Sequence, residues 1–121
     1  MKYIVTGGAG FIGSHIVEAI EGSHEVVVID NFSSGKKANL SGLKNVHCIE
    51  GSICDLFLLK EAFSGADGIF HLGAIASVAR SVDDPVATNS TNLTGTLNVL
   101  LAARDCGVKK VVFSSFIFRK L

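Results

Sequence analysis

Short apolar runs of strand length alternate along this chain with stretches in which apolar residues recur at helical spacing. Such alternation is typical of an α/β protein with a doubly wound parallel sheet. The strands of these sheets are buried on both faces, so they read as continuous apolar runs. The predicted strands cover residues 3–6, 25–30, 46–50, 68–72 and 108–113. Right-handed crossovers between them give the strand order 3-2-1-4-5.

Helices are predicted over residues 11–20, 55–63 and 86–106. Asp55 is a candidate cap for the second helix, Gly65 can end it, and Gly107 can end the third. Residues 31–45 are expected to form a polar loop with one helical turn, and residues 76–85 a second loop. The leucines of the third helix that are expected to face the sheet are Leu93, Leu97, Leu100 and Leu101.

Composition narrows the class of protein. The chain has 121 residues, which fits one domain, and its 48% hydrophobic content argues against disorder. Eleven basic and eleven acidic side chains cancel, so there is no basic excess for nucleic-acid binding. No apolar run approaches the ~20 residues of a membrane span. Three cysteines without metal or redox spacing, and no signal peptide, suggest reduced thiols in a cytoplasmic protein.

A glycine-rich turn, TGGAGFIG, joins the first predicted strand to the first predicted helix. Gly7 suits the tight turn, Gly10 lets the backbone approach a pyrophosphate, and Gly13 allows close packing of helix and strand. The helix start behind the turn offers free N–H groups to phosphates. This context is that of a Rossmann-like dinucleotide site, which a glycine pattern alone would not establish.

Asp30 ends the second predicted strand, near the position expected for the acid of such a site. Its carboxylate can accept hydrogen bonds from the ribose hydroxyls of adenosine. The same charge would repel the additional phosphate of NADP, so NAD is the favoured cofactor. A metal is not expected, because His15, His24 and His47 lack ligand spacing.

Five segments, taken together, resemble the extended short-chain dehydrogenases of the NAD-dependent epimerase/dehydratase family. The closest likeness is to nucleotide-sugar epimerases of the UDP-glucose 4-epimerase kind. It extends over residues 1 to about 115, which are expected to form the NAD-binding domain, and residues 116–121 read as an atypical tail. The segments are TGGAGFIGSHIV, VVVIDNFSSGKKANL, IFHLGAIASV, DDPVATNSTNLTGTLNVL and KKVVFSS.

The resemblance implies roles for individual residues. The glycine turn would hold the pyrophosphate, the residues after the second strand would surround the adenosine ribose, and the end of the fourth strand would line the cleft. Ser52 stands where the family usually has an aspartate beside the adenine, and His71 is expected to be a structural core histidine. The residues implied at the cofactor are Gly7, Gly10, Phe11, Ile12, Gly13, Asp30, Asn31, Ser33, Ser34, Gly35, Ser52, Ile53, Leu72, Gly73, Ala74 and Asn92.

The family's chemistry needs residues that this sequence lacks. Its members pass hydride from a sugar hydroxyl to NAD, and a tyrosine with a lysine four residues later removes the hydroxyl proton. The only tyrosine here is Tyr3, and no Tyr-x-x-x-Lys pair exists. The alignment puts Phe116 at the place of the catalytic serine or threonine, and a shift of one residue would give this role to Ser115.

The abrupt change after Ser115 suggests a truncated form of such an enzyme. Three hypotheses remain open: a nucleotide-sugar epimerase seen in part, a stand-alone NAD-binding module, and an inactive truncated product. Dehydratases and reductases of the same family are the alternatives to an epimerase. A nucleotide sugar is the expected partner of the full-length enzyme. The apolar fifth strand and the residues behind it suggest self-association, unless the tail folds back over that edge.

Overall fold

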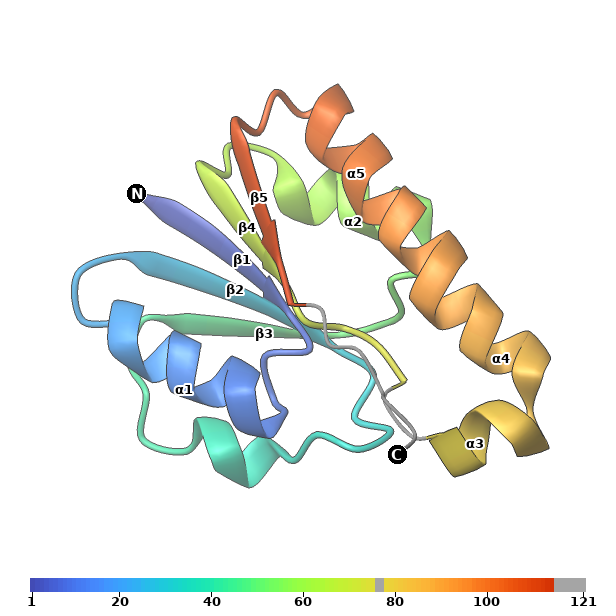
Figure 1. Ribbon diagram of the computed structural model, residues 1–121. Helices are drawn as coiled ribbons and strands as arrows, with labels where there is room; N and C mark the ends of the chain where they lie inside the picture. The colour runs from blue at the N-terminus through green and yellow to red at the C-terminus, as the bar shows by residue number, and fades with distance from the viewer. Residues whose placement is uncertain (76–77, 115–121) are drawn as a thin grey trace.

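The computed structural model describes residues 1–75 and 78–114, and its central feature is one parallel sheet. The strands lie in the order β3-β2-β1-β4-β5, which confirms the predicted topology and fold class (Figure 1). The register places Val5 beside both Val28 and Phe70. The strands are β1 (Lys2–Thr6), β2 (Glu25–Asp30), β3 (Val46–Glu50), β4 (Gly68–His71) and β5 (Lys110–Phe113).

Helices cover both faces of the sheet (Figure 1). One face carries α1, and the opposite face carries α2 and α5, which contact each other. The helix predicted over 86–106 begins at Pro85 and contains a π-helical turn, η2. The helical segments are α1 (Phe11–Ile20), η1 (Lys37–Leu40), α2 (Leu56–Phe63), α3 (Val78–Asp83), α4 (Pro85–Asn89), η2 (Ser90–Thr94) and α5 (Gly95–Asp105).

The core has one apolar cluster on each face of the sheet, because successive strand residues point to opposite faces. Ile4 and Ile69 face α2 and α5, where Phe63 and Val99 are fully buried. Val5 faces the other way, in the cluster that contains residues of α1. Burial on both faces explains why the central strands read as continuous apolar runs.

The expectation that the leucines of the last helix face the sheet was wrong. Leu93, Leu97 and Leu100 are 66%, 54% and 48% exposed, whereas Val99 and Ala102 are fully buried. The helix turns its small residues inward, and a Cβ added at Gly95 would lie 2.5 Å from Ile53 Cδ1. Both stripes have helical spacing, so only the close packing of the helix on its neighbours decides which one is buried.

The expected loop over residues 76–85 was also wrong in part, because α3 occupies Val78–Asp83. The helix is short, so it carries too little periodicity to be recognised. It stops before Pro85, the first residue of α4, since a residue that precedes proline avoids helical geometry. The Asp84 side chain accepts a hydrogen bond from Ala87 N and thereby caps α4.

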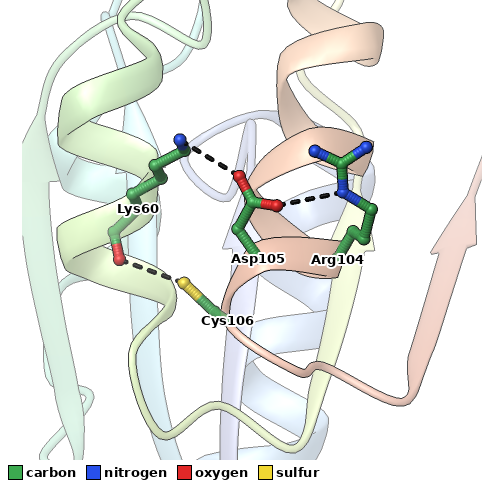
Figure 2. Close-up of polar contacts among 4 residues, drawn as sticks. All are labelled: Lys60, Arg104, Asp105 and Cys106. Carbon is green, nitrogen blue, oxygen red and sulfur yellow. Dashed lines mark hydrogen bonds and ion pairs between the residues drawn. The ribbon is translucent and has the colours of Figure 1, made fainter.

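Polar contacts join the end of α5 to α2 (Figure 2). Asp105 accepts from Lys60 Nζ and from Arg104 Nε, at 3.0 Å each, and Cys106 Sγ donates to the Lys60 carbonyl. The hydrogen bond from Lys60, followed by that from Arg104, holds the pKa of Asp105 below its ordinary value. Exposed ion pairs add little stability, so these contacts mainly fix how α5 approaches α2 before Gly107 turns the chain.

Candidate functional site

The turn between β1 and α1 has a shape that only glycine permits at two positions. Gly7 has a φ of +69°, and a Cβ there would lie 2.8 Å from Gly73 N. A Cβ at Gly13 would overlap the Gly7 carbonyl oxygen, so α1 lies directly against the turn. The predicted roles of Gly7 in a tight turn and of Gly13 in close packing are confirmed.

The start of α1 is open toward the turn. Gly10 occupies the cap position and no side chain caps the helix. The first N–H groups of a helix have no partner within it, so those of Phe11 and Ile12 can bind an anion. The side chains of Phe11 and Ile12 are 79% and 56% exposed, so any contact with a phosphate in the turn would come from their backbone.

Asp30 lies beside this turn, at the carboxyl end of β2. Its side chain is buried and accepts hydrogen bonds from Ala9 N at 3.0 Å and from Phe32 N at 2.7 Å. Phe32 has a φ of +58°, a strained conformation for a bulky residue, which turns the chain sharply after β2. Each carboxylate oxygen has two lone pairs, so each can still accept from a hydroxyl group of a ligand.

A cleft of about 310 Å³ opens at the carboxyl ends of the strands. This is the place at which doubly wound sheets bind ligands. The structure brings most of the predicted cofactor residues together there. They are Gly7, Gly10, Asp30, Asn31, Ser33, Ser34, Gly35, Ser52, Ile53, Leu72, Gly73 and Ala74.

Sequence reasoning missed several residues that line this cleft. Ile29 and Gly51 follow from the ends of β2 and β3, and Ile75 extends the turn after β4. Arg80 of α3, Ala87 of α4 and Thr91 of η2 form another wall. The expectation of a loop at 76–85 concealed the contribution of α3, whereas the strand-end rule would have found Gly51 and Ile75.

Four of the predicted residues do not line the cleft: Phe11, Ile12, Gly13 and Asn92. Asn92 instead binds the backbone of Ile75, with its Oδ1 accepting from Ile75 N at 2.7 Å and its Nδ2 donating to Ile75 O at 2.8 Å. Ser52 lines the cleft, and its Oγ accepts from Cys54 N at 3.0 Å. Ser115 and its alternative Phe116 lie outside the described residues.

His71 is buried between Thr6 and Thr96, as expected for a structural histidine. Its Nδ1 lies 2.6 Å from Thr6 Oγ1, and its Nε2 lies 2.9 Å from Thr96 Oγ1. Burial lowers the pKa of His71. Both ring nitrogens have partners inside the protein, so this side chain is not placed to exchange protons with a substrate.

Two further hollows lie at the opposite end of the sheet, where the strands begin. One of about 390 Å³ includes Tyr3 and Gly68, and one of about 750 Å³ includes Glu25 and Val46. Neither contains a glycine turn or an uncapped helix start. No cluster of three potential metal ligands occurs among residues 1–75 and 78–114. Within the same ranges, no helix has both the length and the apolar character to cross a membrane.

Comparison with known proteins agrees with this site. The NAD dependent epimerase/dehydratase family matches residues 3–115. The UDP-N-acetyl-alpha-D-glucosaminuronate decarboxylase of Bacillus cytotoxicus is 40% identical over 118 residues, which are 94% of this chain and 36% of that protein. A Streptomyces lividans UDP-glucose 4-epimerase is 37% identical, and the match covers 94% of this chain and 35% of that protein. The chain thus spans about a third of the length of these relatives.

Solved structures give the same result. The UDP-glucose 4-epimerase of Thermotoga maritima, determined with UDP-glucose, has a TM-score of 0.89 and 46% identity, and the match covers 95% of this chain and 38% of that one. The Thermus thermophilus UDP-glucose 4-epimerase, in complex with NAD, has a TM-score of 0.84 and 43% identity, with coverages of 93% and 37%. This chain belongs to the NAD-dependent epimerase/dehydratase family.

Proposed function

We propose that this chain is the NAD-binding part of a nucleotide-sugar epimerase similar to UDP-glucose 4-epimerase. In this proposal residues 1–115 form the NAD-binding domain and residues 116–121 a separate tail. The observation that carries it is a single cleft that combines the glycine turn, the uncapped start of α1 and the buried Asp30. The NAD complex of a 43% identical structure supports the cofactor, and the UDP-glucose complex of a 46% identical one supports the substrate class.

The chain's own residues would hold the dinucleotide at two places. The open side of Gly10 and the first N–H groups of α1 would bind the pyrophosphate. Asp30 would accept from the adenosine ribose, held in place by Ala9 N and Phe32 N. A further phosphate on that ribose would lie against the carboxylate, so NAD would bind more tightly than NADP.

Bound NAD supplies an acceptor for the hydride of a sugar hydroxyl. The proton of that hydroxyl needs a base, and the Tyr-x-x-x-Lys pair of the family is missing from the 121 residues. Tyr3 lines the hollow at the opposite end of the sheet, so it cannot replace the base. Ser115 remains the proposed contact of the sugar. The complete activity accordingly depends on groups outside this sequence.

Within the family, decarboxylation or dehydration of a nucleotide sugar is the alternative to epimerisation. A decarboxylase is 40% identical, and a dTDP-glucose 4,6-dehydratase of Streptomyces venezuelae with NAD bound is 36% identical. The proposed NAD cleft is common to these alternatives. The stand-alone module and the inactive product differ from the enzyme only in the fate of the bound NAD.

Two further properties belong to the proposal. Val112 and Phe113 are 48% and 62% exposed on β5, which pairs only with β4 among the described strands, so this edge is proposed for self-association. The three cysteines form no disulfide, which supports a reducing compartment such as the cytoplasm.

Titration calorimetry with NAD and NADP tests the cofactor. We expect NAD to bind at least about tenfold more tightly than NADP, and Asp30→Ala to weaken NAD about tenfold, or ~1.4 kcal/mol. Glu25→Ala is the matched control, since it removes a carboxylate at the other end of the same strand. A preference of the wild type for NADP would contradict the proposal, and so would unchanged NAD affinity in folded Asp30→Ala.

A further inference from the structure

A continuous series of hydrogen bonds runs beneath the proposed cleft, from β1 through β4 to α5. Thr6 and His71 are register partners, so their side chains share the face that α5 covers. Thr6 Oγ1 contacts His71 Nδ1 at 2.6 Å, and His71 Nε2 contacts Thr96 Oγ1 at 2.9 Å. Thr96 Oγ1 then donates to the Asn92 carbonyl at 2.8 Å.

Counting hydrogens fixes the direction of this series. Thr6 Oγ1 accepts from two backbone groups, Leu72 N and Gly73 N, each at 3.1 Å. A hydroxyl has two lone pairs and one hydrogen, so the Thr6 hydrogen must point to His71 Nδ1. The neutral ring then carries its hydrogen on Nε2 and donates it to Thr96. No other arrangement gives every one of these buried groups a partner.

The series holds the turn that follows β4, residues 72–75, which lines the cleft. Thr6 binds the start of this turn at Leu72 and Gly73. Asn92 binds its end, because both polar atoms of the amide side chain contact the backbone of Ile75. Asn92 lies in the π-helical turn η2, where such departures from α-helix often mark functional positions.

We propose that Thr6, His71, Thr96 and Asn92 form one directional hydrogen-bond network that positions the 72–75 turn for cofactor binding. His71 acts in it as a positioning residue, in the neutral form with its hydrogen on Nε2. Asn92 is then a clamp on Ile75 and does not contact the cofactor itself. The inference rests on the proposed NAD function for its consequence, but the network itself exists in the ligand-free protein.

The first test needs no cofactor. Nitrogen-15 NMR of the wild-type chain should find His71 Nδ1 unprotonated and Nε2 protonated near neutral pH. Thr6→Val keeps the shape of the side chain and removes the hydroxyl, so hydrogen exchange at Gly73 N should rise about tenfold. Leu72 N should respond less, because it also donates to the Thr6 carbonyl. Thr6→Ser restores the hydroxyl and should restore protection at Gly73.

The second test measures NAD affinity by calorimetry. Thr6→Val and Thr96→Val should each weaken NAD about tenfold, and Thr6→Ser and Thr96→Ser should stay within about twofold of the wild type. Thr88→Val is the control, since Thr88 Oγ1 donates to a carbonyl within its own helical turn and does not line the cleft.

The outcomes separate the network from the proposed function. A hydrogen on His71 Nδ1, or unchanged exchange at Gly73 in folded Thr6→Val, would overturn the network. Failure of the wild type to bind NAD would overturn the proposed function, and the network would still be judged by the ring tautomer and the exchange. Equal NAD affinity of wild type, Thr6→Val and Thr96→Val would show that the network does not position the turn.

Discussion

Alanine substitutions at Gly10 and Gly13 should separate the two tasks of the glycine turn, cofactor contact and packing. A Cβ at Gly13 would overlap the Gly7 carbonyl and lie 2.8 Å from Gly8 Cα, so backbone atoms must move. Overpacking of this kind costs up to ~3 kcal/mol, and alanine returns ~1 kcal/mol of helix propensity. We therefore expect Gly13→Ala to lower the free energy of unfolding by ~2 kcal/mol.

Gly10→Ala should behave differently. Its Cβ would have one neighbour, the Gly7 carbonyl oxygen at 3.3 Å, so the fold can accept it with a small adjustment. The added methyl group would enter the cleft that Gly10 lines and hold a pyrophosphate away from the helix start. We expect unfolding within ~1 kcal/mol of the wild type and a loss of NAD affinity of about tenfold or more.

Thermal and urea unfolding, followed by calorimetry with NAD, measure both effects. A change of ~1 kcal/mol corresponds to about 4 °C for a domain of this size, so Gly13→Ala should melt about 8 °C lower. Gly22→Ala is the control, because a Cβ there meets nothing within 4 Å. Wild-type stability of Gly13→Ala would refute the close-packing argument, and wild-type NAD affinity of Gly10→Ala would refute the placement of the pyrophosphate.

Three further predictions concern activity, association and pH. The purified 121-residue polypeptide should not interconvert UDP-glucose and UDP-galactose, because it has no Tyr-x-x-x-Lys pair; turnover above a no-protein control would reveal another base. Light scattering over a concentration series should show self-association through the exposed Val112 and Phe113, and a monomer at high concentration with a cooperative melt would contradict this. Burial lowers the pKa of folded His71 below its ordinary 6.5, so the unfolded state binds more protons below that pH. The free energy of unfolding should fall as pH drops from about 7 to about 5, by at most ~1.4 kcal/mol per pH unit, and a pH titration of urea unfolding should show a shallower decline for His71→Asn.

The order of the elements could be predicted from the sequence. Apolar runs and helical spacing identified α1, β2 and β3 at the bounds that the structure has, because these segments are fully periodic and end at clear turn signals. The glycine turn and Asp30 were found for the same reason: the turn and the acid have fixed positions relative to a strand and a helix. Local physics alone determines such features.

The buried face of α5 depended on its neighbours. Leu97 and Val99 both belong to stripes with helical spacing, and hydrophobicity favoured the leucines. The tertiary structure selected the stripe of small residues, because Gly95 lets the helix approach Ile53 closely. Packing distance between elements is absent from the pattern of a single helix.

The partners of the polar groups were decided by the tertiary structure as well. The sequence placed Asn92 near a cofactor, but only the fold brings Ile75 within reach of both of its amide atoms. It marked His71 as structural, but the contact of Thr6 with two backbone N–H groups is what orients the ring. The sequence by itself determined which chemistry is present and at which strand ends; long-range contacts decided which donor meets which acceptor, because hydrogen bonds depend on distances that only the folded chain defines.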